Sequence, residues 1–196
     1  MHGVVFVALR HHLKEAGDES LVSACFPQPS TYLAIGDYPD EDMVEIANRV
    51  AARMSGVSSS EVLRGLGEGV PPALKRIAPT VLPKASGLDE LLEQMAGGGS
   101  GGARWVLPRF EVAERDTRMI TLTHRGTAAL CRFDEGMITG FAALVGESVA
   151  LRHPSCRNRR DRDCVFVLRP VPADKRSSSR RGSGSLRGTR PLGDKS

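Results

Sequence analysis

The sequence predicts an α+β fold in one domain, with a helical N-terminal half and a C-terminal half built from an antiparallel sheet and one long helix. Two observations support this prediction. In the first half, apolar residues recur at helical spacing between glycine and proline stops. In the second half, short β-rich segments alternate with turns, and one long helical pattern interrupts them. The hydrophobic content of 40% is enough for one packed core.

The first predicted helices follow from apolar periodicity and glycine stops. Residues 4–16 form an apolar opening helix that ends at Gly17, and a short second helix follows it. In residues 40–56, apolar side chains, Met54 included, recur at helical spacing until Gly56.

Capping and proline signals predict the next helices. Ser58 and Glu61 have the spacing of a capping box, which begins a helix. Pro71 and Pro72 suit the first turn of another short helix, because proline is tolerated there. Residues 87–95 form a last short helix before a glycine-rich loop.

The second half is expected to hold the sheet and the long helix. A turn at Arg115 and Asp116 joins the first two strands, and residues 126–146 form a helix with one apolar stripe. A polar connection then joins the last two strands. The four expected strands are residues 103–114, 117–125, 147–153 and 164–170.

The positive charge is concentrated at the C-terminus. Residues 171–196 contain seven basic and two acidic side chains, although the whole chain has a net charge of only +4. They are rich in Ser, Gly and Arg, so we expect a domain at residues 1–170 and a disordered basic tail at 171–196. Such a tail could contact an acidic partner or nucleic acid.

The sequence also indicates where in the cell the protein is expected. The chain has no apolar stretch near the roughly 20 residues needed to span a bilayer, and its start lacks the pattern of a signal peptide. We therefore expect a cytoplasmic protein. In that compartment, the four cysteines would be free thiols, metal ligands or redox sensors rather than structural disulfides.

Four residues in the second half have the chemistry of a metal site. Cys131, His153, Cys156 and Cys164 follow the spacing C-x21-H-x2-C-x7-C. Three thiolates and one imidazole make a complete tetrahedral set for Zn²⁺. The last three residues lie at the facing ends of two predicted strands. The alternative is that the cysteines are small, inert core residues, and spacing without a CxxC pair leaves both possibilities open.

Other candidate sites are weaker. His124 and Arg125 follow a strand and could bind an acidic group, but we expect them to be surface residues. No arrangement of nucleophile, base and orienting group can be assembled, so we do not expect an enzyme.

Several segments together resemble the haem nitric-oxide/oxygen-binding (H-NOX) family. They are "MHGVVFVALRHHL", "YPDEDMVEIANRVAARMSGVSSSEVLRGLG", "GLDELLEQM" and the strands and long helix that follow. The resemblance covers residues 1–170 and implies an α+β sensor domain. It also implies signalling partners such as histidine kinases or cyclic-dinucleotide enzymes.

The haem residues of this family match poorly. Its proximal histidine lies in an L-D-x-L-H stretch, and here Leu92 occupies that position, where it cannot be a ligand. Its Y-x-S-x-R motif, which holds the haem propionates, becomes T-L-T-H-R, with Arg125 as the remnant. Haem is implied by the family but is not expected from these residues.

The cysteines match better. The chain resembles a subset of the family with a zinc site of the same spacing as Cys131, His153, Cys156 and Cys164. The leading hypothesis is therefore a sensor that responds to oxidants or nitrogen oxides through its zinc-ligand cysteines. The alternatives are a haem sensor of NO or O2 with a non-standard ligand, a sensor of a small apolar ligand in the vacated haem cleft, and nucleic-acid binding through the tail.

Overall fold

The computed structural model describes residues 1–17, 19–26, 32–82, 84–96, 110–116, 119–124 and 126–171. It confirms the predicted α+β architecture of a helical first half and an antiparallel sheet with one long helix. The helices are α1 (Gly3–Glu15), α2 (Glu19–Cys25), α3 (Asp40–Ala51), α4 (Ser59–Ile77), α5 (Leu88–Ala96) and α6 (Cys131–Leu144). The strands are β1 (Phe110–Asp116), β2 (Met119–His124), β3 (Ser148–Ser155) and β4 (Cys164–Val171).

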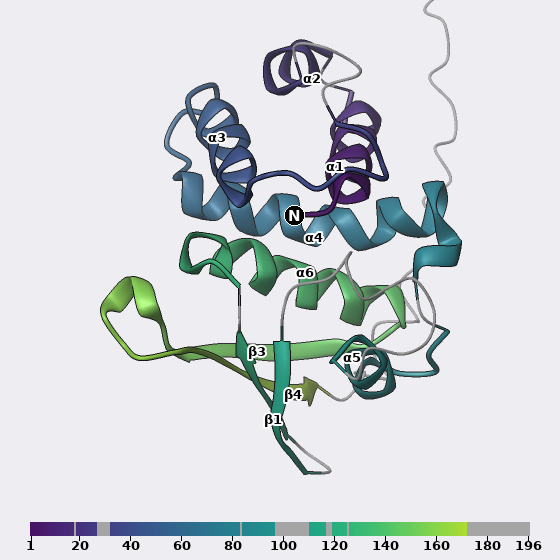
Figure 1. Ribbon diagram of the computed structural model, residues 1–196, viewed down its shortest axis with the longest axis vertical. Coiled ribbons are helices and arrows are strands. Elements are labelled where there is room, and N and C mark those ends of the chain that lie inside the picture. Colours follow the sequence, from purple (N-terminus) through teal and green to yellow (C-terminus); the bar gives the residue numbers. More distant parts are fainter. Residues whose placement is uncertain are drawn as a thin grey trace, which may run out of the picture.

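The elements form layers that place α6 at the centre of the molecule (Figure 1). α1 and α3 pack on one side of α4, and α6 lies between α4 and the sheet. The sheet has the order β1-β2-β4-β3, and every neighbouring pair is antiparallel. The short helix α5 lies at one end of the sheet, beside β1. No described helix is long and apolar enough to cross a membrane.

Glycines let α4 and α6 pack backbone against backbone. A Cβ atom on Gly67 of α4 would lie 2.1 Å from the carbonyl oxygen of Phe133, and one on Gly136 of α6 would lie 2.0 Å from that of Arg64. Both distances are far below any real contact, so only glycine fits at these two positions. This close approach fixes the position of α6, including its first turn, against α4.

The prediction that Pro71 and Pro72 begin a new helix is wrong, because both lie inside α4. The capping box of Ser58 and Glu61 does begin that helix. A proline at position 72 has no N–H for the carbonyl of Glu68. That carbonyl faces Gly140 of α6, where an added Cβ would lie 2.6 Å from it. Tertiary packing therefore outweighs the usual cost of proline within a helix.

Two other boundaries differ from the predictions. α3 ends at Ala51 rather than near Gly56, and the side chain of Met54 is exposed rather than part of the apolar stripe. The strand β1 continues through Asp116, which pairs with Met119, so no turn occurs at Arg115 and Asp116. The predicted glycine-rich loop and the tail beyond Val171 lie outside the described residues.

Candidate metal centre

The β3–β4 connection brings three of the candidate ligands together. His153 lies near the end of β3, Cys156 follows that strand, and Cys164 begins β4. The pairing register shifts between Arg152 and Ser155, which is the signature of a β-bulge. A bulge turns a side chain away from its regular direction. His153 lies in it, and its ring stacks on Phe166 with the centroids 4.3 Å apart.

The fourth candidate ligand comes from α6. Cys131 is the first residue of that helix, and its side chain is buried. One ligand atom from each of Cys131, His153, Cys156 and Cys164 lies within 4.8 Å of the other three. The Sγ atom of Cys156 is 3.7 Å from that of Cys131 and 4.0 Å from that of Cys164. The structure thus brings together the four residues that the sequence selected.

The connection also supplies hydrogen-bond donors to two of the sulfur atoms. The backbone N–H of Arg157 donates to Sγ of Cys164 at 3.4 Å, and the side-chain amide of Asn158 donates to Sγ of Cys131 at 3.5 Å. A carboxylate oxygen of Asp161 accepts from the backbone N–H of Cys156 at 2.7 Å, which holds the loop in shape. N–H donors of this kind are typical of the groups that surround and orient metal-binding sulfur atoms.

His153 has the protonation state of a metal ligand. Burial lowers the pKa of its imidazole below the ordinary value, which favours the neutral ring. Its Nε2 atom is buried and has no hydrogen-bond partner among the described residues. A buried polar atom without a partner is costly, and a cation bound at this point would provide one.

The thiols influence one another through their charges. Burial, together with the neighbouring Cys156, raises the pKa of the Cys131 thiol to about 12. Burial opposes ionisation of Cys156 as well, but backbone N–H donors from Asn158 and Arg159 and the adjacent thiols hold its pKa below the ordinary value. Three thiolates this close repel one another, so a divalent cation is the natural counter-charge for the cluster.

A buried ion pair that the sequence analysis missed lies beside the cluster. His124 Nε2 is 2.5 Å from a carboxylate oxygen of Asp134, and both side chains are almost fully buried. Burial raises the pKa of Asp134. Burial lowers the pKa of His124, but the hydrogen bond and charge of Asp134, together with Cys164, raise it above the ordinary value. His124 pairs with Cys164 across the β2–β4 ladder.

The expectation that His124 is a surface residue is therefore wrong. Residues two apart on a strand share a face, and Ile120, Leu122 and His124 are all on the buried face of β2. That alternation was visible in the sequence and could have identified His124 as a core residue. The partner Asp134 could not have been assigned, because only packing places α6 against the end of β2.

Of the two positions that the haem motifs of the family indicate, the structure describes one, Leu92. Leu92 of α5 is buried, and its aliphatic side chain has no atom that can bind iron. Arg125, the other residue carried over from the haem motifs, lies outside the described residues. Leu92 itself therefore offers no ligand for iron.

Comparison with known proteins relates the chain to others by structure. No family model and no curated protein matches the sequence. An H-NOX protein from S. oneidensis in the Fe(II)NO ligation state is 17% identical with a TM-score of 0.74, and the match covers 87% of this chain and 99% of that one. An Fe(II) unliganded H-NOX protein from K. algicida is 18% identical with a TM-score of 0.69, covering 87% and 97%. This chain has the fold of H-NOX proteins over most of its length.

Proposed function

We propose that the chain is a signalling sensor domain whose cluster of Cys131, His153, Cys156 and Cys164 binds Zn²⁺ and responds to oxidants or nitrogen oxides. The observation that carries this proposal is the convergence of four ligand atoms within 4.8 Å of one another. They come from α6, β3 and the two ends of the β3–β4 connection. A metal bound there would tie the long helix to the edge of the sheet.

The donor set favours zinc among divalent metals. Three sulfur atoms and one imidazole nitrogen suit Zn²⁺, whereas Mg²⁺ and Ca²⁺ require oxygen ligands. Zn²⁺ with three thiolates has a net charge of −1. The surrounding connection carries Arg157, Arg159, Arg160 and Arg162, which offset that charge. A closed set of four protein ligands is typical of a structural site, and it leaves no open position for substrate.

The response would take place at sulfur. A cysteine thiolate attacks a hydroperoxide, its sulfur is oxidised to sulfenic acid, and hydroxide leaves. A second thiol of the cluster then attacks that sulfur, a disulfide forms and water leaves. Together the two cysteines supply the two electrons that reduce the peroxide. The Sγ distances of 3.7 Å and 4.0 Å make either pair with Cys156 reachable, since a disulfide bond is about 2.05 Å long.

Oxidation would change the contact between α6 and the sheet. Each cysteine lost from the cluster removes a zinc ligand, and a zinc site with two thiolates oxidised cannot hold its metal. α6 is fixed on its other side by the glycine contact with α4. The change would therefore be concentrated at the first turn of α6 and the β3–β4 connection. A partner such as a histidine kinase or a cyclic-dinucleotide enzyme would detect it there.

Metal analysis of the purified full chain tests the zinc centre. We expect about one zinc per chain in reduced protein, and a loss of nearly all of it in Cys131→Ser and Cys156→Ser. Cys25→Ser is the matched control, because Cys25 is also buried but lies on α2, outside the cluster. Hydrogen peroxide should release the zinc with two thiols consumed per peroxide. Reduced protein without zinc, or zinc retained after cysteine oxidation, would refute the proposal.

The second candidate function is a haem-based gas sensor. The structural likeness to H-NOX proteins in Fe(II) states favours it, and Leu92 opposes it. An absorbance band near roughly 400 nm in protein expressed with iron and a haem precursor would support this candidate. Colourless protein that contains zinc would support the zinc-based sensor instead.

A further inference from the structure

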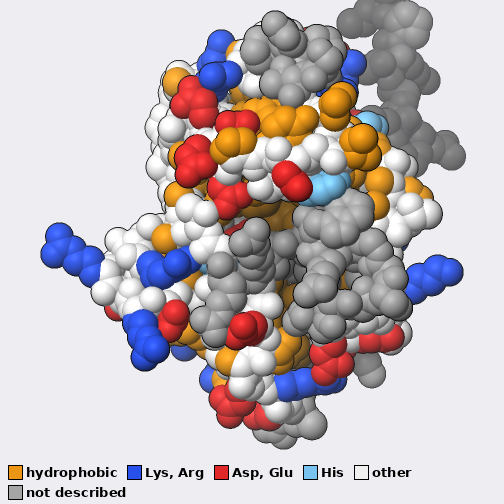
Figure 2. All heavy atoms as spheres, viewed as in Figure 1, with side chains coloured by type: hydrophobic (Ala, Val, Ile, Leu, Met, Phe, Trp, Pro, Cys, Tyr) orange, Lys and Arg blue, Asp and Glu red, His pale blue; other side chains and the backbone are white. Residues whose placement is uncertain are grey.

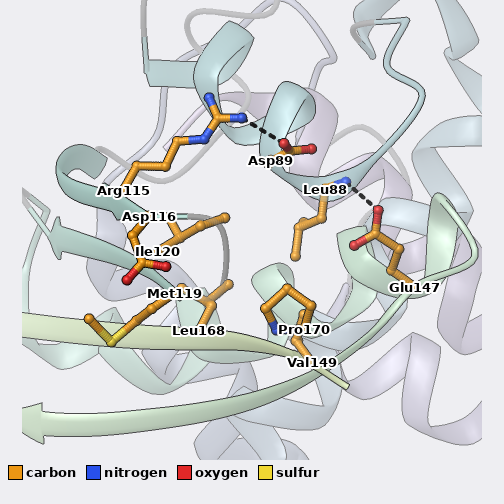
Figure 3. A pocket seen from close by; sticks show the side chains of 10 residues that line it. All are labelled: Leu88, Asp89, Arg115, Asp116, Met119, Ile120, Glu147, Val149, Leu168 and Pro170. Carbon is orange, nitrogen blue, oxygen red and sulfur yellow. Dashed lines mark hydrogen bonds and ion pairs between the residues drawn. The ribbon is translucent and has the colours of Figure 1, made fainter. Parts of the chain in front are cut away.

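A pocket of about 590 Å³ lies between α5 and the end of the sheet that is far from the cysteines. Figure 3 shows the side chains that line it, which come from α5, from β1, β2, β3 and β4, and from the turn after α6. Its inner wall includes Leu88, Ile120 and Leu168, which are almost fully buried. Its polar side chains are Asp89, Arg115, Asp116 and Glu147.

The rim of this pocket is acidic. Among the described residues that line it, Arg115 is the one basic side chain, and it is already bound by Asp89 at 2.7 Å and by Glu93 just outside the pocket. Asp116 and Glu147 add two further carboxylates. Four carboxylates thus face one guanidinium around an apolar wall. Such a surface is complementary to a segment that has both basic and aliphatic side chains.

The other end of the sheet has the opposite charge. The β3–β4 connection presents Arg157, Arg159, Arg160 and Arg162, with Asp161 and Asp163 among them. In Figure 2, basic side chains project at the left, where this connection lies, and acidic ones gather lower down around α5 and β1. A basic segment would therefore be repelled from the metal end and attracted to the pocket end.

The chain itself continues from the edge of the pocket. Pro170 lines the pocket, β4 ends at Val171, and residues 172–196 follow. That segment has seven basic and two acidic side chains, and its aliphatic side chains include Leu186 and Leu192. The 15 residues from Val171 to Leu186 could span up to about 50 Å, so length does not prevent the segment from returning to the pocket.

We propose that the basic segment 172–196 binds back into this pocket, with a leucine against the apolar wall and arginines on the rim carboxylates. Individual exposed ion pairs contribute little. The covalent link at Val171 compensates, because it holds the segment near the pocket at an effective concentration on the order of millimolar. The bound segment would cover α5 and the adjacent strand ends, and salt would release it.

Zero-length carbodiimide cross-linking of the full chain, followed by mass spectrometry, tests this contact. Lys195 should form amide bonds mainly with Asp89, Asp116 and Glu147, and rarely with Glu41 on the distant acidic start of α3. These cross-links should be lost at about 1 M NaCl, where the screening length falls to about 3 Å. Arg187→Ser with Arg190→Ser should reduce them without altering the pocket.

Limited digestion with trypsin at low salt gives a second measurement. Cleavage after Arg187, which precedes Gly188, should be about threefold faster or more when Glu147→Gln and Asp116→Asn remove two rim charges. Glu147→Gln keeps an acceptor for the N–H of Leu88, and Glu41→Gln is the matched control that should change nothing.

Three results would overturn the proposal. The first is an even spread of Lys195 cross-links over surface carboxylates. The second is cleavage at equal rates in the rim variants and the wild type. The third is a rim cross-link that joins an isotope-labelled chain to an unlabelled one, which would assign the pocket to a second copy.

Discussion

The two ends of the sheet differ in what they offer a bound group. At one end, Cys131, His153, Cys156 and Cys164 bring four soft ligand atoms within 4.8 Å, under a basic loop. At the other end lie α5, which carries the buried aliphatic Leu92, and an acidic pocket. One strand, β4, runs between them, from Cys164 to the wall residue Leu168.

This difference shows that two ends of one sheet can offer very different chemistry to a bound group. The chain keeps the architecture of H-NOX proteins at 17–18% identity. A metal site, however, depends on the donor atoms of a few side chains. Replacing one donor by leucine removes a ligand without disturbing the layers, because leucine packs well in a core. Adding three cysteines and a histidine at strand and helix ends creates a site for the same reason.

Removing the metal should have the largest effect. We expect a strong chelator to lower the free energy of unfolding of the reduced wild type by several kcal/mol, because a structural Zn²⁺ site can contribute on the order of 10 kcal/mol. The melting temperature should fall with it, and added Zn²⁺ should restore it. Without chelator, Cys131→Ser should already have the low melting temperature of the chelator-treated wild type, and chelator should not lower it further. Equal melting temperatures with and without chelator would contradict a structural metal at this end.

Restoring an iron ligand at the other end should change haem binding. Leu92→His supplies an imidazole where α5 has a leucine, so we expect it to bind added haem and to show an absorbance band near roughly 400 nm. Leu92→Ala is the control, because it removes the leucine side chain without supplying a ligand. If the wild type or Leu92→Ala bound haem as well as Leu92→His, the lack of a histidine at position 92 would not be what prevents haem binding.

The sequence was sufficient to predict the fold class. For the cluster, spacing left two possibilities open, and the resemblance to a zinc-bearing subset favoured a metal site. Helical and strand periodicities report on local burial, and they identified α1, α5, α6 and the strands of the sheet. Cysteine and histidine are chemically distinctive, so Cys131 could be grouped with the other three ligands although 21 residues separate it from His153. Such signals depend on residue type and spacing alone.

Features that depend on packing could not be predicted. Local sequence predicts a helix start at Pro71 and Pro72, but both lie inside α4. The free carbonyl of Glu68 faces Gly140, which is almost 70 positions later in the sequence, so local signals could not reveal this contact. The pairing of His124 with Asp134 depends on how α6 lies on β2. Neither local propensity nor spacing carries that information. The acidic pocket likewise forms from five separate segments, none of which is unusual by itself.

Ion pairs at the two ends should also differ in strength. Asp134→Ala should lower the free energy of unfolding by about 3 kcal/mol, because it leaves His124 buried without its partner. Asp89→Ala removes an exposed partner of Arg115 and should cost less than about 1 kcal/mol. Urea unfolding of zinc-saturated protein measures both. If both variants lost a similar free energy of unfolding, burial would not explain a difference in strength between the two ion pairs.

The smallest effect should come from the cap of α5. Glu147 accepts a hydrogen bond from the backbone N–H of Leu88 at 3.0 Å, which satisfies one free donor at the start of that helix. Glu147→Ala should therefore cost about 1 kcal/mol, and Glu147→Gln should recover most of it because an oxygen acceptor remains. Hydrogen exchange should show the loss as faster opening of α5 alone, with the amides of β4 near Cys164 unchanged. Faster exchange at both ends would mean that α5 and the metal end open as one unit, and the two ends could no longer be treated as independent.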